Sequence, residues 1–344
     1  MILPGLVNAH THLDLSGAAG QTPPTQLFPV WLKSVIGYRM SRSAVDVQAD
    51  IQSGFKQLAT AGTAAVADIR AGGSPGGWPS DRICGTLFHE VIGLAPERGT
   101  QMLKSARNAS DSSASANITH GLSPHSPYSV GRAVFAGLQS TDDICVHLAE
   151  SAEELELLEH RTGPFVEFLQ SVNAWHPTEI LNVSEILAVA HRVKSMLIAH
   201  GNLLTAEQWR TLPATASVVY CPRTHHAFGH PPHPYQQMLA DGVNVALGTD
   251  SLASNPDLDV WNEARFLHAQ PSSATPQILV RMATLNGWQA LNRTASNTRD
   301  WLVLPLRASE PDPFCGLLEA DPSSRCTLAE VFVDDIPQPF GNTT

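Results

Sequence analysis

The chain contains few cysteines and no paired cysteine motif. There are five cysteines among 344 residues, and no two of them form a Cys-x-x-Cys pair. This odd, scattered set argues against a disulfide framework and against a zinc knuckle built from cysteines. We therefore expect a protein of a reducing compartment, the cytoplasm.

Long hydrophobic runs are absent, and charge is scarce. No apolar run approaches the roughly 18 residues that a membrane span needs, and the N-terminus lacks the basic region and long apolar segment of a signal peptide. The net charge of −11 argues against a nucleic-acid or anionic-membrane partner. The expected partner is a small molecule, which suits a soluble enzyme and a soluble binder equally. The sequence does not fix the oligomeric state, and a homodimer is considered.

What the chain does have is eight short apolar runs that alternate with helical patterns. With 43% hydrophobic and 15% charged residues, it can build a large core. The alternation predicts a (β/α)₈ barrel of the TIM type, with a doubly wound sheet as the runner-up. The expected strands are 2–12, 63–69, 84–94, 117–122, 144–147, 196–200, 217–221 and 243–248.

The connecting segments predict helices and one loop. We expect helices at 30–40, 45–61, 102–107, 130–139, 152–172, 235–240 and from the N-cap Ser184 to residue 193, with Thr205 capping a short helix. The polar stretch 108–117 is expected to be a mobile loop.

The tail differs from the rest of the chain. Residues 1–295 are expected to form the barrel and 296–344 a small, incomplete β element, with strands at 300–304 and 329–333 separated by a Pro-rich loop. No element precedes the first strand, so we expect a chain that is short at its N-terminus.

His10 and His12 end the first predicted strand. On a strand, the i, i+2 spacing sends both imidazoles to the same side. Alone, such a pair is more often two unrelated polar side chains in a turn. However, His147, His200 and Asp250 also end predicted strands, and α/β barrels build their active sites at that face.

Five segments, in order, resemble the amidohydrolase superfamily, in the branch of cytosine deaminase, adenosylhomocysteine deaminase and the atrazine-type chlorohydrolases. The resemblance spans residue 4 to about 290 and is more specific for the superfamily than for a substrate. The segments are PGLVNAHTH (4–12), SPHSPY (123–128), HLAE (147–150), AHG (199–201) and LGTDS (247–251).

The resemblance implies a metal site. It makes His10, His12, His147 and Asp250 the ligands of one divalent metal, for which zinc is best suited, although iron could occupy it. Binuclear relatives carry a bridging lysine carbamate in strand four, and residues 117–122 contain no lysine. A single metal is therefore expected.

The resemblance also implies catalytic roles. Water activated by the metal would attack an electron-poor ring carbon that bears an amine. Glu150 would protonate the ring nitrogen and help to deliver a proton to the leaving ammonia, His200 would hydrogen-bond the water or polarise the group under attack, and Asp250 would accept the water's proton. The simpler interpretation of Glu150 is a helix N-terminal acid.

Substrate contacts are less defined. His125 resembles a position that contacts the sugar or ring of nucleosides, and it could equally be a turn residue between two prolines. The segment with Arg223 and His225 resembles deaminases of aminodeoxyfutalosine, whose carboxylate an arginine can pair bidentately; Arg70 is the competing arginine. We therefore predict hydrolytic deamination of an aminated purine nucleoside or related ring. The alternatives are another leaving group, such as chloride or a cyclic amide, and a non-catalytic metal-binding relic.

Overall fold

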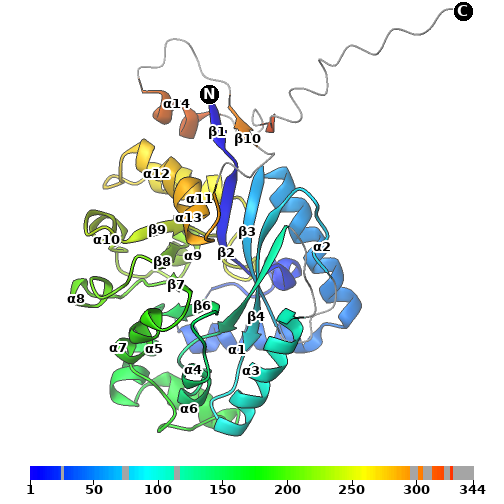
Figure 1. Ribbon diagram of the computed structural model, residues 1–344, viewed down its shortest axis with the longest axis vertical. Helices are drawn as coiled ribbons and strands as arrows, with labels where there is room; N and C mark the ends of the chain where they lie inside the picture. The colour runs from blue at the N-terminus through cyan, green and yellow to red at the C-terminus, as the bar shows by residue number, and fades with distance from the viewer. Residues whose placement is uncertain are drawn as a thin grey trace, which may run out of the picture.

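Eight parallel strands form a barrel in chain order (Figure 1). The computed structural model describes residues 1–24, 27–71, 77–111, 117–294, 301–304, 312–320 and 326–327. The strands are β2 (Leu6–Thr11), β3 (Thr63–Arg70), β4 (Cys84–Val91), β5 (Ile118–Pro124), β6 (Asp143–Leu148), β7 (Ser195–His200), β8 (Ala216–Tyr220) and β9 (Asn244–Leu247). Each strand pairs with the next one along the chain. The (β/α)₈ prediction is therefore confirmed, because a doubly wound sheet reverses its strand order.

The barrel closes between the end of β9 and β2. The backbone N–H groups of Thr249 and Asp250 both donate to the carbonyl of His10, at 3.1 and 3.0 Å. The Asn8 amide also donates to the Thr249 hydroxyl at 2.8 Å. A side chain at Gly248 would bring its Cβ within 2.8 Å of the His10 Cβ, so this approach requires glycine. Closure therefore brings the ends of β2 and β9 together.

Helices surround the barrel. They are α1 (Phe28–Ser41), α2 (Ala44–Thr60), α3 (Pro96–Asp111), α4 (Arg132–Ala136), α5 (Ala152–His160), α6 (Pro164–Ser171), α7 (Val183–Leu187), α8 (Ala206–Trp209), α9 (Pro222–Ala227), α10 (Tyr235–Ala240), α11 (Val260–His268), α12 (Pro276–Ala283) and α13 (Leu285–Ala290), with 3₁₀ turns at Leu13–Ala18 and Ala188–His191. Within the described ranges, no helix has the length and hydropathy to cross a membrane.

Three helix predictions need correction. The region 152–172 holds two helices, because Gly163 takes a φ of +88° and Pro164 then begins α6. Asn182, not Ser184, caps α7, and its side chain forms a capping box with Glu185. Helix α3 continues to Asp111, into the expected loop, whereas residues 112–116 lie outside the described part of the chain.

A second, three-stranded sheet joins the two ends of the described chain. Strand β1 (Ile2–Pro4) pairs antiparallel with β10 (Trp301–Val303), which pairs with β11 (Cys326–Thr327). Figure 1 shows β1 and β10 side by side near the N-terminus. The first predicted strand is thus divided at Gly5, and its opening residues belong to the small sheet.

The expected tail strand at 300–304 is confirmed by β10. The Pro-rich loop expected after it needs correction, because this connection contains helix α14 (Pro313–Glu319), which begins behind the N-cap Asp312. The other expected strand, 329–333, lies outside the described residues. The boundary at residues 295 and 296 stays a prediction, although β1 pairs across it.

Candidate metal centre

Four side chains converge at the carboxyl ends of β2, β6 and β9. His10, His12, His147 and Asp250 are all buried, and one ligand atom from each lies within 4.8 Å of the others. The Asp250 Oδ1 is 3.6 Å from the Nε2 of His10 and 3.7 Å from that of His12. The Nε2 atoms of His12 and His147 are 3.1 Å apart. This buried group could bind a metal ion.

The group fits a divalent cation. Ligands about 2.0–2.2 Å from zinc at tetrahedral angles lie about 3.4 Å from one another, close to the separations observed here. Among the described residues, neither ring nitrogen of His10 has a hydrogen-bond partner, although both are buried. The Nδ1 of His147 donates to the carbonyl of His125 at 2.8 Å, which leaves its Nε2 lone pair for a metal.

Protonation states agree with ligation. Burial holds the pKa values of His12 and His147 well below the usual value, so both rings are neutral at pH 7. Burial alone would raise the pKa of Asp250, but the nearby imidazoles of His10, His200 and His12 lower the pKa below its usual range. Neutral imidazoles and an ionised carboxylate are the forms that bind metals.

The strand ends turn sharply at this face. Ala149, His200 and Asp250 have φ values of +54°, +68° and +60°, in the left-handed region that non-glycine residues rarely adopt. Such strain persists where surrounding contacts impose it, and it often accompanies functional sites. These turns direct the side chains that follow the strands over the barrel mouth.

The hydroxyl of Ser254 orients the Asp250 carboxylate. Its Oγ donates to the Asp250 Oδ2 at 2.8 Å and lies 3.1 Å from the Thr224 hydroxyl. We expect Ser254→Ala to lower metal affinity or kcat/KM by roughly 10–100-fold, because outer hydrogen bonds orient ligating carboxylates. Metal titration and steady-state kinetics measure both. Ser171→Ala, which removes a hydroxyl bonded within α6 to Phe168, is the control, and equal values for the two variants would contradict the role.

Glu150 and His200 lie beside the four ligand candidates. The Glu150 Oε1 is 3.4 Å from the His200 Nε2, and both residues are buried. Burial, followed by the nearby Asp250 and Glu154, raises the pKa of Glu150 well above its usual value. Burial lowers the pKa of His200 to about 3. Burial thus favours the protonated form of the Glu150 carboxyl group and the neutral form of the His200 imidazole.

The N-terminal cap of α5 is formed by neighbours of Glu150. Ser151 is the N-cap of α5, and its side chain accepts from the backbone N–H of Glu154. Glu150 therefore precedes the helix. The Glu154 carboxylate instead accepts from the backbone N–H groups of Ala149 and Glu150, at 3.1 and 2.7 Å. The sequence analysis did not predict that Glu154 holds the backbone of Ala149 and Glu150. The Ser-x-x-Glu spacing of Ser151 and Glu154, which is typical of a helix N-terminus, could have indicated it.

His125 lies against the ligand candidates. Its ring centroid is 4.3 Å from that of His147, and its Nδ1 lies 2.8 Å from the Glu90 Oε1. Arg39 holds the other Glu90 oxygen at 2.9 Å. These contacts could not be predicted from the motifs, because Arg39 and Glu90 lie on α1 and β4, outside the motif segments. His125 thus contacts the candidate centre and also supports His147 through its carbonyl.

Both predicted carboxylate-binding arginines are bound within the protein. The Arg223 guanidinium holds both Asp257 oxygens at 2.6 and 2.7 Å, and its Nε donates to Glu263 at 2.7 Å. Arg70 donates to Asp68 at 2.6 Å and to the carbonyl of Gly77 at 3.2 Å. The guanidinium groups of both arginines thus already bind carboxylates of the protein itself. This argues against substrate recognition by either arginine.

His225 is turned toward the backbone. Its Nε2 lies 2.9 Å from the carbonyl of Pro231, and burial lowers its pKa to about 4. It also lines a cavity of about 930 Å³ with Tyr220 and His233, and His233 contacts the carbonyl of His200 at 2.9 Å. His225 therefore lies on a cavity wall next to the His200 loop.

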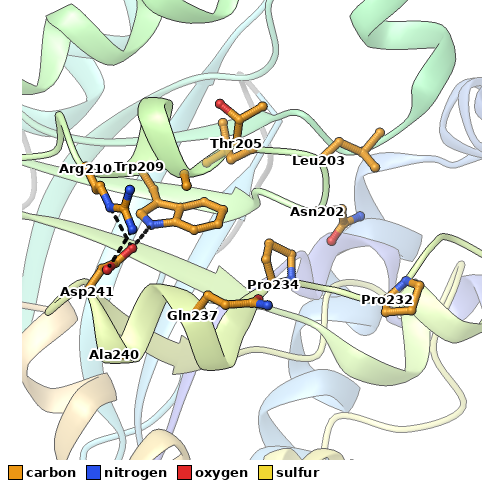
Figure 2. A pocket seen from close by; sticks show the side chains of 12 residues that line it. Asn202, Leu203, Thr205, Trp209, Arg210, Pro232, Pro234, Gln237, Ala240 and Asp241 are labelled. Atoms are coloured by element: carbon orange, nitrogen blue, oxygen red, sulfur yellow. Dashed lines mark hydrogen bonds and ion pairs between the residues drawn. The ribbon is translucent and has the colours of Figure 1, made fainter.

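A second hollow, of about 530 Å³, lies between α8 and α10. Figure 2 shows Trp209 and Arg210 turned toward Asp241 at its edge, with Asn202 on the opposite side. The Asn202 amide donates to the carbonyl of Glu150 at 2.9 Å. None of the four ligand candidates lines this hollow, so it is separate from the centre.

An eight-stranded α/β barrel with buried histidines and an aspartate at its carboxyl face defines a metal-dependent hydrolase. The chain belongs to the amidohydrolase family, whose model matches residues 1–297. It is 28% identical to an aminodeoxyfutalosine deaminase of Deinococcus radiodurans over 83% of this chain and 72% of that protein. It is 26% identical to a 5-methylthioadenosine/S-adenosylhomocysteine deaminase of Pyrococcus furiosus over 89% and 74% of the two chains.

A solved structure supports the same fold. An adenosine deaminase of Xanthomonas campestris with bound zinc superposes with a TM-score of 0.70 at 19% identity, over 94% of this chain and 77% of that one. This structure confirms the fold, and the family match over residues 1–297 confirms the predicted resemblance to amidohydrolases and the assignment to hydrolases.

Proposed function

We propose that this protein hydrolytically deaminates an aminated purine nucleoside, using one divalent cation, zinc, held by His10, His12, His147 and Asp250. The observation that carries the proposal is the placement of a buried carboxyl group, Glu150, 3.4 Å from the imidazole of His200 and beside one buried ligand set. Burial raises the pKa of Glu150. Acid and ligands occupy the same carboxyl face of the barrel. Deamination needs both an activated water and a proton donor at that place.

The chain's own residues divide the work. A bound divalent cation supplies Lewis acidity and lowers the pKa of water toward neutrality. Glu150, whose burial favours the protonated form, would donate to the ring nitrogen and so make the neighbouring carbon electron-poor. His200, neutral and 3.4 Å from Glu150, orients the water or the amino group. Asp250 would accept one proton from the water and pass it to the amine, which leaves as ammonia. Glu150, by then a carboxylate, would take the second proton of that water as the ring carbonyl forms, so that both side chains are restored.

Bulk solvent has little access to the side chains proposed to hold the metal and transfer protons. Among the residues assigned to ligation and proton transfer, none exceeds 4% exposure. Phe28 and Trp31 of α1 contact Phe228, which follows α9, with centroid separations of 5.4 and 4.9 Å. Phe28 and Trp31 are buried, so these rings pack against one another within the apolar core.

The relatives support the substrate class. The names of the two relatives described above refer to nucleosides as substrates, and both names describe removal of an amine. The internal pairing of Arg70 and Arg223 leaves the aminodeoxyfutalosine assignment without its expected carboxylate partner. The purine nucleoside is therefore the proposed class, and aminodeoxyfutalosine is one member to be tested.

Ammonia release by zinc-loaded protein tests the proposal. The panel comprises aminodeoxyfutalosine, methylthioadenosine, adenosylhomocysteine and adenosine, with cytosine and a chlorinated triazine as non-nucleoside comparisons. We expect ammonia from at least one nucleoside and a higher kcat/KM for it than for cytosine. Chloride release from the triazine without ammonia from any nucleoside would contradict the proposal and favour another leaving group. Metal-loaded protein that is inactive on every compound would favour a non-catalytic barrel.

A further inference from the structure

A second group of metal-binding side chains lies where α14 contacts the barrel. His268 is in the last turn of α11, and Cys315 and Glu319 lie one turn apart on α14. The i, i+4 spacing places the thiol and the carboxylate on the same face of α14, and that face meets His268. Figure 1 shows α14 near the N-terminus, above α12. It lies at the end of the molecule where β1 and β10 are, away from the carboxyl ends of the strands that carry the first centre.

The three donor atoms are spaced as zinc ligands are. The His268 Nε2 is 3.7 Å from the Cys315 Sγ and 3.7 Å from the Glu319 Oε1, and the sulfur is 3.4 Å from that oxygen. Ligand distances of about 2.0–2.3 Å at tetrahedral angles give separations of about 3.4–3.6 Å between such donors. One cation can therefore contact all three atoms with small side-chain adjustments.

Protein contacts already hold the two helices together at this place. The Arg265 Nε donates to the carbonyl of Leu318 at 2.9 Å, and the side chains of Leu317 and Leu318 are buried. The Glu319 side chain is 64% exposed and that of His268 is 23% exposed, so ions and water can reach the donors. Packing of α14 against α11 thus brings the three donor atoms together, and one side of the group remains exposed to solvent.

We propose that His268, Cys315 and Glu319 bind a second divalent cation, Zn²⁺, whose fourth position is filled by water. Imidazole, thiolate and carboxylate are all zinc ligands, and the thiolate selects zinc over magnesium or calcium. Cys315 binds as the thiolate and releases its proton to the solvent. The bound ion links α14 to α11 and so fixes α14 on the barrel. This site is independent of the proposed deamination.

Cobalt substitution tests the second site directly. A thiolate bound to Co²⁺ gives a near-ultraviolet charge-transfer band, and the first centre contains no cysteine among its four ligand candidates. The full-length protein is stripped with a chelator, reconstituted with Co²⁺, and examined by absorption and metal analysis. We expect the thiolate band and about two ions per chain, compared with about one in Cys315→Ser.

Two further variants make the test decisive. Cys84→Ser removes a partly buried thiol on β4 and should keep both the band and the second ion. Glu319→Gln changes one exposed ligand. It should lower the affinity of the second site for its ion by about tenfold or more and leave ammonia release unchanged. A protein with one ion and no thiolate band would overturn the proposal, because the thiol would then only hydrogen-bond to His268 and Glu319. A band that persists in Cys315→Ser would also overturn it.

Discussion

Replacing Glu150 by glutamine is expected to lower kcat by about 10²–10⁴-fold while the protein keeps its metal, because positioned proton transfer contributes that much. The amide retains the size of the carboxyl group and its place 3.4 Å from His200, but it cannot supply the acidic proton. The backbone N–H of Glu150 is held by Glu154, so the loop does not depend on the side chain that is changed. Steady-state kinetics with metal analysis on the same sample measures both quantities.

The matched control is Glu159→Gln, which removes an exposed carboxylate at the other end of α5. This variant should retain the turnover of the unmodified protein. Full turnover in Glu150→Gln with a normal metal content would contradict the assigned proton transfer. A loss of metal in Glu150→Gln would instead give Glu150 a ligating or structural role.

Replacing Arg223 by alanine is expected to destabilise the fold by about 3–5 kcal/mol, because removing one member of a buried ion pair leaves the other charge unpaired. Glu263 is fully buried and accepts from both the backbone N–H and the Nε of Arg223. Its remaining described partner is the amide of Asn255, at 2.7 Å. Chemical denaturation gives the free energy of unfolding.

Arg210→Ala is the control for Arg223→Ala. Arg210 also donates twice to a carboxylate, that of Asp241, but its side chain is 61% exposed, so its loss should change stability by at most about 1 kcal/mol. Equal effects of the two substitutions would contradict the buried role. A selective rise in KM for a carboxylated substrate, with unchanged stability, would restore Arg223 as a substrate-binding residue.

The barrel was predictable because its signals are local. Each of the eight strands is a short apolar run bounded by loops, and each confirmed strand overlaps its predicted range. The convergence of His10, His147 and Asp250 followed from topology, since all three end or follow strands and parallel strands share one carboxyl face. Alternation along the strand added His12.

The contacts that the sequence did not reveal are formed by distant side chains. Arg223 pairs with Asp257 and Glu263, which lie 34 and 40 positions away. The hydrophobic periodicity of these segments carries no information about that pairing. Strand β1 pairs with β10 across almost the whole chain, so Ile2–Pro4 seemed continuous with β2. Ser254 and Glu154 hold the motif residues Asp250 and Glu150, and only the folded geometry shows which atoms they hold.

The most direct test of the account is the dependence of ammonia release on the metal at the barrel mouth. The Cys315→Ser protein, in which the barrel centre is the expected zinc site, is stripped with a chelator, and zinc is returned in steps with a purine nucleoside that the unmodified protein deaminates. The account predicts that ammonia release disappears with the metal and returns in proportion to bound zinc, up to about one ion per chain. Undiminished ammonia release from the stripped protein would contradict it.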